Sequence, residues 1–254
     1  MAYNKKERWA NMNYLMNYKE YGDTSNPTIM LIHGEFLSAW NYDLIIDQLK
    51  DRYHILLPLL DGHQGSKEHF ISIEHIAKKI IEDINNHYDG QLALIGGLSL
   101  GGQILCEMLS IKADICQYAI IESADVMKEK SFVAKPKDQL SYRLSLHNYH
   151  LNRKQKKQYK ESSKIDKEDF IKINEAMRHY VLKETIASTK AKVYVEVGSK
   201  EKNYIPSCTH IHHTIKKSQM IIMYRYAHGD FSLNHVSSYA NLITKLMKQK
   251  NTRS

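Results

Sequence analysis

The sequence GLSLG, residues 97–101, places a serine between two glycines. In a sharp strand-to-helix turn, such a serine presents its hydroxyl at the edge of a sheet, and flanking side chains would collide across the turn. The apolar run QLALIGG, residues 91–97, precedes Ser99, and a helix-compatible run follows it. This context predicts that Ser99 is an activated nucleophile and not an idle serine in a glycine-rich turn.

Two further stretches accompany this motif. HGEF occupies residues 33–36, and PLLDGHQGS occupies residues 58–66. Together with residues 97–101, they resemble the H-G-x loop, the P-D-x-x-G-H-G-x-S loop and the nucleophile elbow of the α/β-hydrolase superfamily. The second stretch departs from its pattern at Leu59 and Gln64. The resemblance covers nearly the whole chain and implies an α/β-hydrolase fold with serine-dependent catalysis.

The same resemblance implies an oxyanion hole built from backbone N–H groups. In the family these come from the residue after the nucleophile and from the H-G loop, here Leu100 and Glu35, with Phe36 as the neighbouring alternative. Such donors stabilise the charge that develops on the carbonyl oxygen. Because a carboxylate facing that oxygen would oppose this, we expect the Glu35 side chain to turn away or to pair with a base. We expect His33 to be structural.

The general base is expected late in the chain, because the family order is serine, acid, histidine. His228 follows the strand-like run QMIIMYRY, residues 219–226, where the resembling enzymes place their histidine. His235 is the alternative, but it lies within or near the predicted final helix. We therefore favour His228.

The acid that orients the histidine is expected after the preceding strand, in a G-x-x-D pattern. The chain has Gly198 and, three residues later, Glu201, a glutamate where the family usually has aspartate. Glutamate can also hold the imidazole of a triad. Asp125, just past another predicted strand, is the alternative, and we favour Glu201.

The elements that must position these residues alternate between strand and helix. Buried apolar runs predict parallel strands, and apolar residues at three-to-four-residue spacing predict helices. The pattern predicts an α/β fold with a doubly wound, mostly parallel sheet. The expected strands are 28–34, 53–60, 91–97, 117–123, 192–198 and 219–226, and the expected helices are 37–49, 73–87, 100–111, 209–217 and 236–248.

One segment interrupts this alternation. Residues from about 125 to 190 contain no convincing strand, and we interpret them as a helical cap inserted into a single domain spanning residues 1–254. The net charge of +8 lies wholly in residues 128–190, where sixteen Lys and Arg accompany eight Asp and Glu. No nucleic-acid motif accompanies this charge, so we interpret it as a solvated helix face and expect no nucleic-acid partner.

No motif predicts a metal or a cofactor. The three cysteines are widely spaced, and the histidines of residues 210–213 lack metal-binding spacing. The sequence contains no G-x-G-x-x-G or Walker pattern. Its first residues lack the continuous apolar stretch of a signal peptide or membrane span, so we expect a cytoplasmic protein without a membrane partner.

These residues favour hydrolysis of a small ester or thioester, in the manner of a carboxylesterase (EC 3.1.1). Ser99 would attack the carbonyl, His228 would take and return the proton, and Glu201 would orient the imidazole. Two alternatives remain open: hydrolysis or lyase chemistry at a carbon–carbon bond with the same residues, and a ligand-binding homologue with slow or no turnover. Fold alone does not decide between them.

Overall fold

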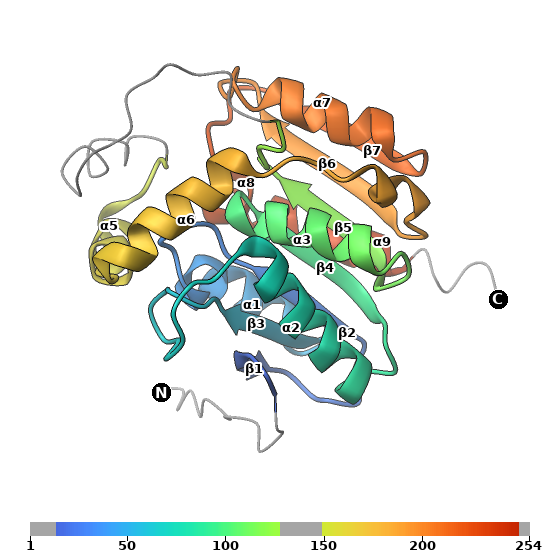
Figure 1. The fold of residues 1–254 in the computed structure, drawn as a ribbon. Helices are drawn as coiled ribbons and strands as arrows, with labels where there is room; N and C mark the ends of the chain where they lie inside the picture. The colour runs from blue at the N-terminus through green and yellow to red at the C-terminus, as the bar shows by residue number, and fades with distance from the viewer. Residues whose placement is uncertain (1–13, 128–148, 249–254) are drawn as a thin grey trace.

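The computed structural model describes residues 14–127 and 149–248. Its centre is a seven-stranded sheet with the order β1-β3-β2-β4-β5-β6-β7 (Figure 1). All neighbouring strands are parallel except β1, which runs antiparallel to β3. The strands are β1 (Asn17–Tyr21), β2 (Thr28–Ile32), β3 (His54–Leu59), β4 (Leu92–Leu98), β5 (Cys116–Glu122), β6 (Lys192–Gly198) and β7 (Ser218–Met223). The predicted doubly wound, mostly parallel sheet is confirmed.

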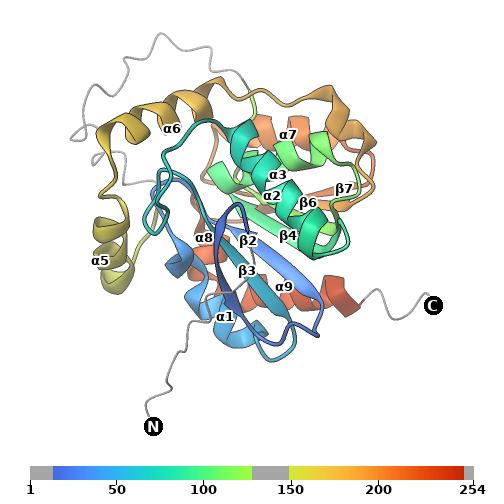
Figure 2. The ribbon, with the colours of Figure 1, turned by 60° about the horizontal axis from the view of Figure 1, so that its bottom comes forward.

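Helices cover both faces of this sheet. The helices α2, α3 and α7 pack on one face, and α1 and α9 pack on the other (Figure 2). The helical elements are η1 (Ala39–Tyr42), α1 (Asp43–Leu49), α2 (Ile73–His87), α3 (Leu100–Ile111), α5 (Arg153–Ser162), α6 (Lys167–His179), η3 (Glu184–Ser188), α7 (Ile205–Thr214), α8 (Asp230–Asn234) and α9 (Val236–Lys248). Within the described ranges, none of these helices has the length and apolar character needed to cross a membrane.

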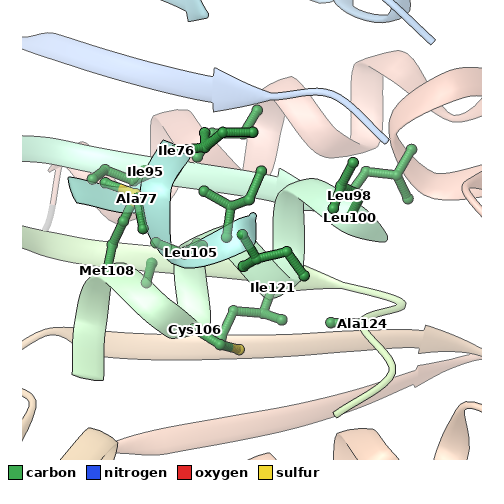
Figure 3. Close-up of a cluster of buried hydrophobic side chains, with 14 of the residues drawn as sticks. Ile76, Ala77, Ile95, Leu98, Leu100, Leu105, Cys106, Met108, Ile121 and Ala124 are labelled. Carbon is green, nitrogen blue, oxygen red and sulfur yellow. The ribbon is translucent and has the colours of Figure 1, made fainter. Parts of the chain in front are cut away.

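The central strands are apolar because both of their faces are covered. Every residue of β3 and β4 is buried. Figure 3 shows the core between sheet and helices, where Ile95 of β4 and Ile121 of β5 lie with Leu105 and Met108 of α3 and Ile76 of α2. Ten consecutive residues of α3, from 100 to 109, are buried. This packing fixes the start of α3, and Ser99 directly precedes it.

The structure departs from the sequence-based expectation at several element boundaries. Strand β1 was not predicted, because its sequence NYKEY is polar and only Tyr18 is buried, as befits an edge strand. Helix α7 begins four residues earlier than expected, since Pro206 suits the first turn of a helix. Strand β7 ends at Met223, and Arg225 then takes a left-handed φ of 66° in the turn that follows.

Helices α5 and α6 lie beyond the carboxyl ends of the parallel strands (Figures 1 and 2). The Ser162 hydroxyl donates to the carbonyl of Phe36 at 2.8 Å, and the Gln155 amide donates to the carbonyl of Leu233 at 2.9 Å. No strand occurs in residues 149–190, in keeping with the expected helical segment. The rest of the predicted insertion, residues 128–148, lies outside the described residues.

Candidate active site

Ser99 occupies a strained turn between β4 and α3. Its backbone has φ 54° and ψ −112°, a conformation that L-residues avoid and that carries a strain of about 1–3 kcal/mol. A Cβ at Gly97 would lie 2.3 Å from the carbonyl oxygen of Gly101, and a Cβ at Gly101 would lie 2.2 Å from that of Ile32. Gly97 is therefore required by a backbone contact across the turn, and Gly101 by a backbone contact with the end of β2.

The turn places Ser99 at the carboxyl edge of the sheet, where ligands bind in open α/β folds. Its backbone N–H donates to the carbonyl of Glu122 at 2.8 Å, and its carbonyl accepts from the N–H of Gln103 at 3.0 Å. Only 2% of the residue is exposed. The nucleophile candidate is thus held by the neighbouring strand on one side and by α3 on the other.

His228 and Glu201 meet at the same edge. Nδ1 of His228 donates to Oε1 of Glu201 at 2.6 Å, and both side chains are buried. Oε2 of Glu201 accepts from the backbone N–H of Gly198 at 2.6 Å and from the Ser123 hydroxyl at 2.8 Å. The Glu201 side chain folds back towards the Gly198 N–H. This conformation accommodates the methylene that glutamate has in addition to those of aspartate. Because Nδ1 carries the shared proton, Nε2 is the nitrogen left to accept another.

The surrounding charges set the basicity of this imidazole. Burial lowers the pKa of His228, but the hydrogen bond and charge of Glu201, with the carboxylates of Glu35 and Glu122, outweigh burial and raise the pKa above its ordinary value of 6.5. A raised pKa makes the imidazole a stronger base. It also means that the base becomes neutral, and so able to accept a proton, only above pH 6.5.

The Ser99 hydroxyl does not point to His228. It donates to Oε2 of Glu35 at 2.7 Å, while Nε2 of His228 is buried without a hydrogen-bond partner among the described residues. The expectation that Glu35 turns away or pairs with a base was therefore wrong. Phe36 has a left-handed φ of 55° and its ring stacks on Phe170, and this anchored kink directs the preceding side chain towards Ser99.

The two predicted backbone donors flank the nucleophile. Leu100 is the first residue of α3, so its N–H has no acceptor within the helix. Glu35 lies in the loop after β2, and its side-chain contact with Ser99 brings this loop to the elbow. The role of these two residues in an oxyanion hole remains a prediction.

The alternative base and acid are engaged elsewhere. His235 follows α8, and its ring stacks on Tyr226 with the ring centroids 3.9 Å apart. Asp125 accepts hydrogen bonds from the hydroxyl of Ser207 and the backbone N–H of Met127. Within the described residues, His228 makes no hydrogen bond with Asp125. The geometry therefore favours Glu201 as the partner of His228.

The chain was compared with protein-family models, with known sequences and with solved structures. No protein-family model matches the sequence. A stretch of 90 residues is 30% identical to the uncharacterized hydrolase YugF of Bacillus subtilis (strain 168), covering 34% of this chain and 33% of YugF. The chain thus spans about a third of the length of that relative.

Solved structures match over most of the chain. An α/β hydrolase family protein from Desulfitobacterium hafniense superposes with a TM-score of 0.73 at 21% identity, over 91% of this chain and 100% of that one. A lipase-esterase related protein from Clostridium acetobutylicum superposes with a TM-score of 0.74 at 18% identity, over 91% and 99%. The chain has the α/β-hydrolase fold. At these identities the likeness establishes the fold alone.

Several residues of the candidate site have no sequence signal. The ring centroid of Tyr149 lies 5.2 Å from that of His228, and the ring centroid of Tyr204 lies 4.6 Å from it. Tyr149 precedes α5 and Tyr204 precedes α7, and neither belongs to a motif of the fold. Ser123, which holds Glu201, follows β5 with a left-handed φ of 53°. Only the folded arrangement brings these residues to His228.

Two further carboxyl groups are buried beneath the acid. Glu122 of β5 and Glu196 of β6 are direct neighbours in the parallel register. Oε1 of Glu122 accepts from the backbone N–H of Ser232 at 3.2 Å. Burial raises the pKa of Glu122 to about 7, with a further contribution from the charge of Glu201, and burial raises the pKa of Glu196 well above its ordinary value. Burial thus favours the protonated, uncharged form of both carboxyl groups.

The described residues contain no cluster of three or more His, Cys, Asp or Glu side chains arranged to hold a metal ion. The histidines of residues 210–213 lie on α7, where His210 and His213 are exposed. The third, His212, pairs through Nδ1 with the Ser218 hydroxyl at 2.8 Å.

Proposed function

We propose that this protein is a serine hydrolase that cleaves small esters or thioesters, of the carboxylesterase type (EC 3.1.1), through an acyl-enzyme. The observation that carries the proposal is the buried His228–Glu201 hydrogen bond of 2.6 Å, which leaves Nε2 as a proton acceptor at the sheet edge that also carries Ser99. Glu35 links the two, because it contacts Ser99 and its charge also raises the pKa of His228. A nucleophile, a base and an orienting acid therefore share one edge of the sheet.

The chemistry begins when the Ser99 hydroxyl turns from Glu35 to Nε2 of His228. Oγ forms a bond to the carbonyl carbon as its proton passes to Nε2, and the carbonyl electron pair moves onto oxygen. The backbone N–H groups of Leu100 and Glu35 are the proposed donors to that oxyanion. Collapse breaks the bond to the leaving alcohol or thiol, which takes the proton from Nε2. Water then repeats the sequence, releasing the acid and restoring Ser99.

The test is hydrolysis of p-nitrophenyl esters of increasing acyl length by the parent and by Ser99→Ala. We expect turnover by the parent and a loss of up to about a million-fold in kcat in the variant, since only the nucleophile is removed. Alanine fits the turn, so circular dichroism should show an unchanged fold. Activity in Ser99→Ala within tenfold of the parent would contradict the proposal.

A second candidate function rests on the Ser99–Glu35 contact. Because the hydroxyl donates to a carboxylate and not to Nε2, the site could bind a ligand and turn it over slowly or not at all. Under this alternative, the parent binds small carbonyl compounds, and its esterase activity equals that of Ser99→Ala.

A further inference from the structure

The Glu35 carboxylate contacts the nucleophile directly. It accepts the Ser99 hydroxyl at 2.7 Å, and its side chain is only partly buried. Within the described residues, no basic side chain forms a salt bridge with Glu35. Glu201, in contrast, is paired with His228. A negative charge at this position opposes the formation of an oxyanion and repels anionic substrates. A substrate that supplies a positive charge here would remove both obstacles.

The surroundings of Glu35 also suit a cation. The Tyr149 hydroxyl lies beside Gly34, the residue before Glu35, at 2.9 Å from where a Cβ on that glycine would stand. The rings of Tyr149 and Tyr204 both lie close to His228. Phenol oxygens accept hydrogen bonds from ammonium groups, and aromatic faces attract cations. One carboxylate therefore contacts Ser99, and two tyrosine rings lie close to His228.

The position of the carboxylate limits where the cation can be. Because Glu35 touches the attacking oxygen, the positive charge must lie close to the carbonyl under attack. In an α-amino ester the nitrogen is two bonds from the carbonyl carbon, a distance of about 2.5 Å. A cation at the end of a long acyl chain would lie far from Glu35. The geometry favours an α-ammonium group.

We propose that Glu35 selects esters of α-amino acids by binding the substrate ammonium group, and that this binding releases the Ser99 hydroxyl to His228. The inference rests on the proposed function and adds its substrate class. The ammonium group takes the place of the Ser99 proton donor at Glu35 and neutralises the charge that would oppose the oxyanion. Nε2 of His228 then accepts a hydrogen bond from the Ser99 hydroxyl.

The experiment compares alanine methyl ester with methyl 2-methylpropanoate, in which a methyl group replaces the ammonium group. Both esters are assayed at pH 7, where an ordinary α-amino group, with a pKa of about 7.7–8.0, is mostly protonated. The readout is the ratio of kcat/KM values for the two esters in the parent and in Glu35→Gln, which keeps the backbone N–H. The matched control is Glu82→Gln, because Glu82 is exposed on α2.

We expect Glu35→Gln to lower the ratio roughly ten- to a hundred-fold, the value of one charge-assisted contact. The ratio cancels any change in Glu35→Gln that affects both esters alike, and Glu82→Gln should keep the parent ratio. A ratio unchanged in Glu35→Gln, or an equal rise for both esters, would overturn the inference while leaving the proposed function intact. Failure of the parent to hydrolyse any ester would instead reject the proposed function.

Discussion

The two sides of the candidate site differ in how far they are prepared for chemistry. On the base side, Glu201 accepts from His228, from the Ser123 hydroxyl and from the backbone N–H of Gly198. On the nucleophile side, Ser99 donates to Glu35, and no described residue meets Nε2 of His228. The base side is preorganised in the free protein, whereas the nucleophile side needs a substrate to complete it.

The supporting elements explain this difference. The base side stands on turns that directly follow β5, β6 and β7, which are neighbours in the sheet. The nucleophile side depends on the loop after β2, which α5 and α6 hold through Ser162 and Phe170. Short turns at the ends of packed strands fix side chains more firmly than a loop held by helices α5 and α6.

The largest effect on turnover is expected when the base side loses the His228 imidazole. His228→Ala should lower kcat by up to about a million-fold, because without a base the serine proton has no acceptor. The measurement is steady-state ester hydrolysis. His235→Ala is the control, since that ring stacks on Tyr226, and it should stay within a few-fold of the parent. The reverse pattern would move the base to His235.

Removing the charge of the acid should have the next largest effect. Glu201→Gln should lower kcat by up to about ten-thousand-fold, as in other triads that lose their carboxylate. We expect the ascending limb of the pH profile of kcat/KM to lie above pH 6.5 in the parent, because the pKa of His228 is raised. It should move to lower pH in Glu201→Gln, since the carboxylate contributes to that increase.

Asp125→Asn is the matched control for this prediction and should be nearly silent, because its carboxylate is bonded to Ser207. If Asp125→Asn is the damaging change and Glu201→Gln is tolerated, the acid has been misassigned. If both variants retain activity, Ser99 and His228 act as a pair without a third member.

A smaller effect is expected from the hydroxyl that positions the acid. Ser123→Ala removes one hydrogen bond to Glu201 and leaves the bond from the Gly198 N–H in place. We expect kcat to fall roughly three- to tenfold, the value of about 1 kcal/mol, with KM little changed. A loss as large as that of Glu201→Gln would show that the base side depends on this single contact and is less preorganised than we infer.

The smallest effect on turnover is expected at Glu122, which acts on stability. Its folded pKa of about 7 exceeds its ordinary value of 4.5, so the folded state binds more protons between these values. Stability should therefore fall as pH rises from about 4.5 to 7, by about 3 kcal/mol from this group. Urea unfolding across this range should show a shallower decline in Glu122→Gln. A decline as steep as that of the parent would contradict the assignment.

The fold was largely predictable because its central strands are apolar runs buried on both faces, and α2, α3 and α9 follow clear helical spacing. Helix α3 begins at Leu100 and ends at Ile111, as predicted. Strand β1 escaped prediction because an edge strand buries few residues. The start of α7 escaped because its apolar spacing gave no indication of the first turn at Pro206.

Within the site, predictability followed the motifs. The positions of Ser99, His228 and Glu201 are tied to strand ends, and the structure brings them to one edge of the sheet. The orientation of the Glu35 side chain was predicted wrongly, because it depends on the kink at Phe36 and on packing against α6. Tyr149, Tyr204 and Ser123 reach the site only through tertiary packing, which residue spacing along the chain does not encode.

Labelling with a fluorophosphonate tests the central claim most directly. An activated serine displaces fluoride and forms a phosphorus–oxygen bond that intact-protein mass spectrometry detects. We predict one adduct per chain in the parent, located on Ser99 by peptide mapping, none in Ser99→Ala and strongly slowed labelling in His228→Ala. A folded parent that takes up no label, or that carries it on another residue, would contradict the account.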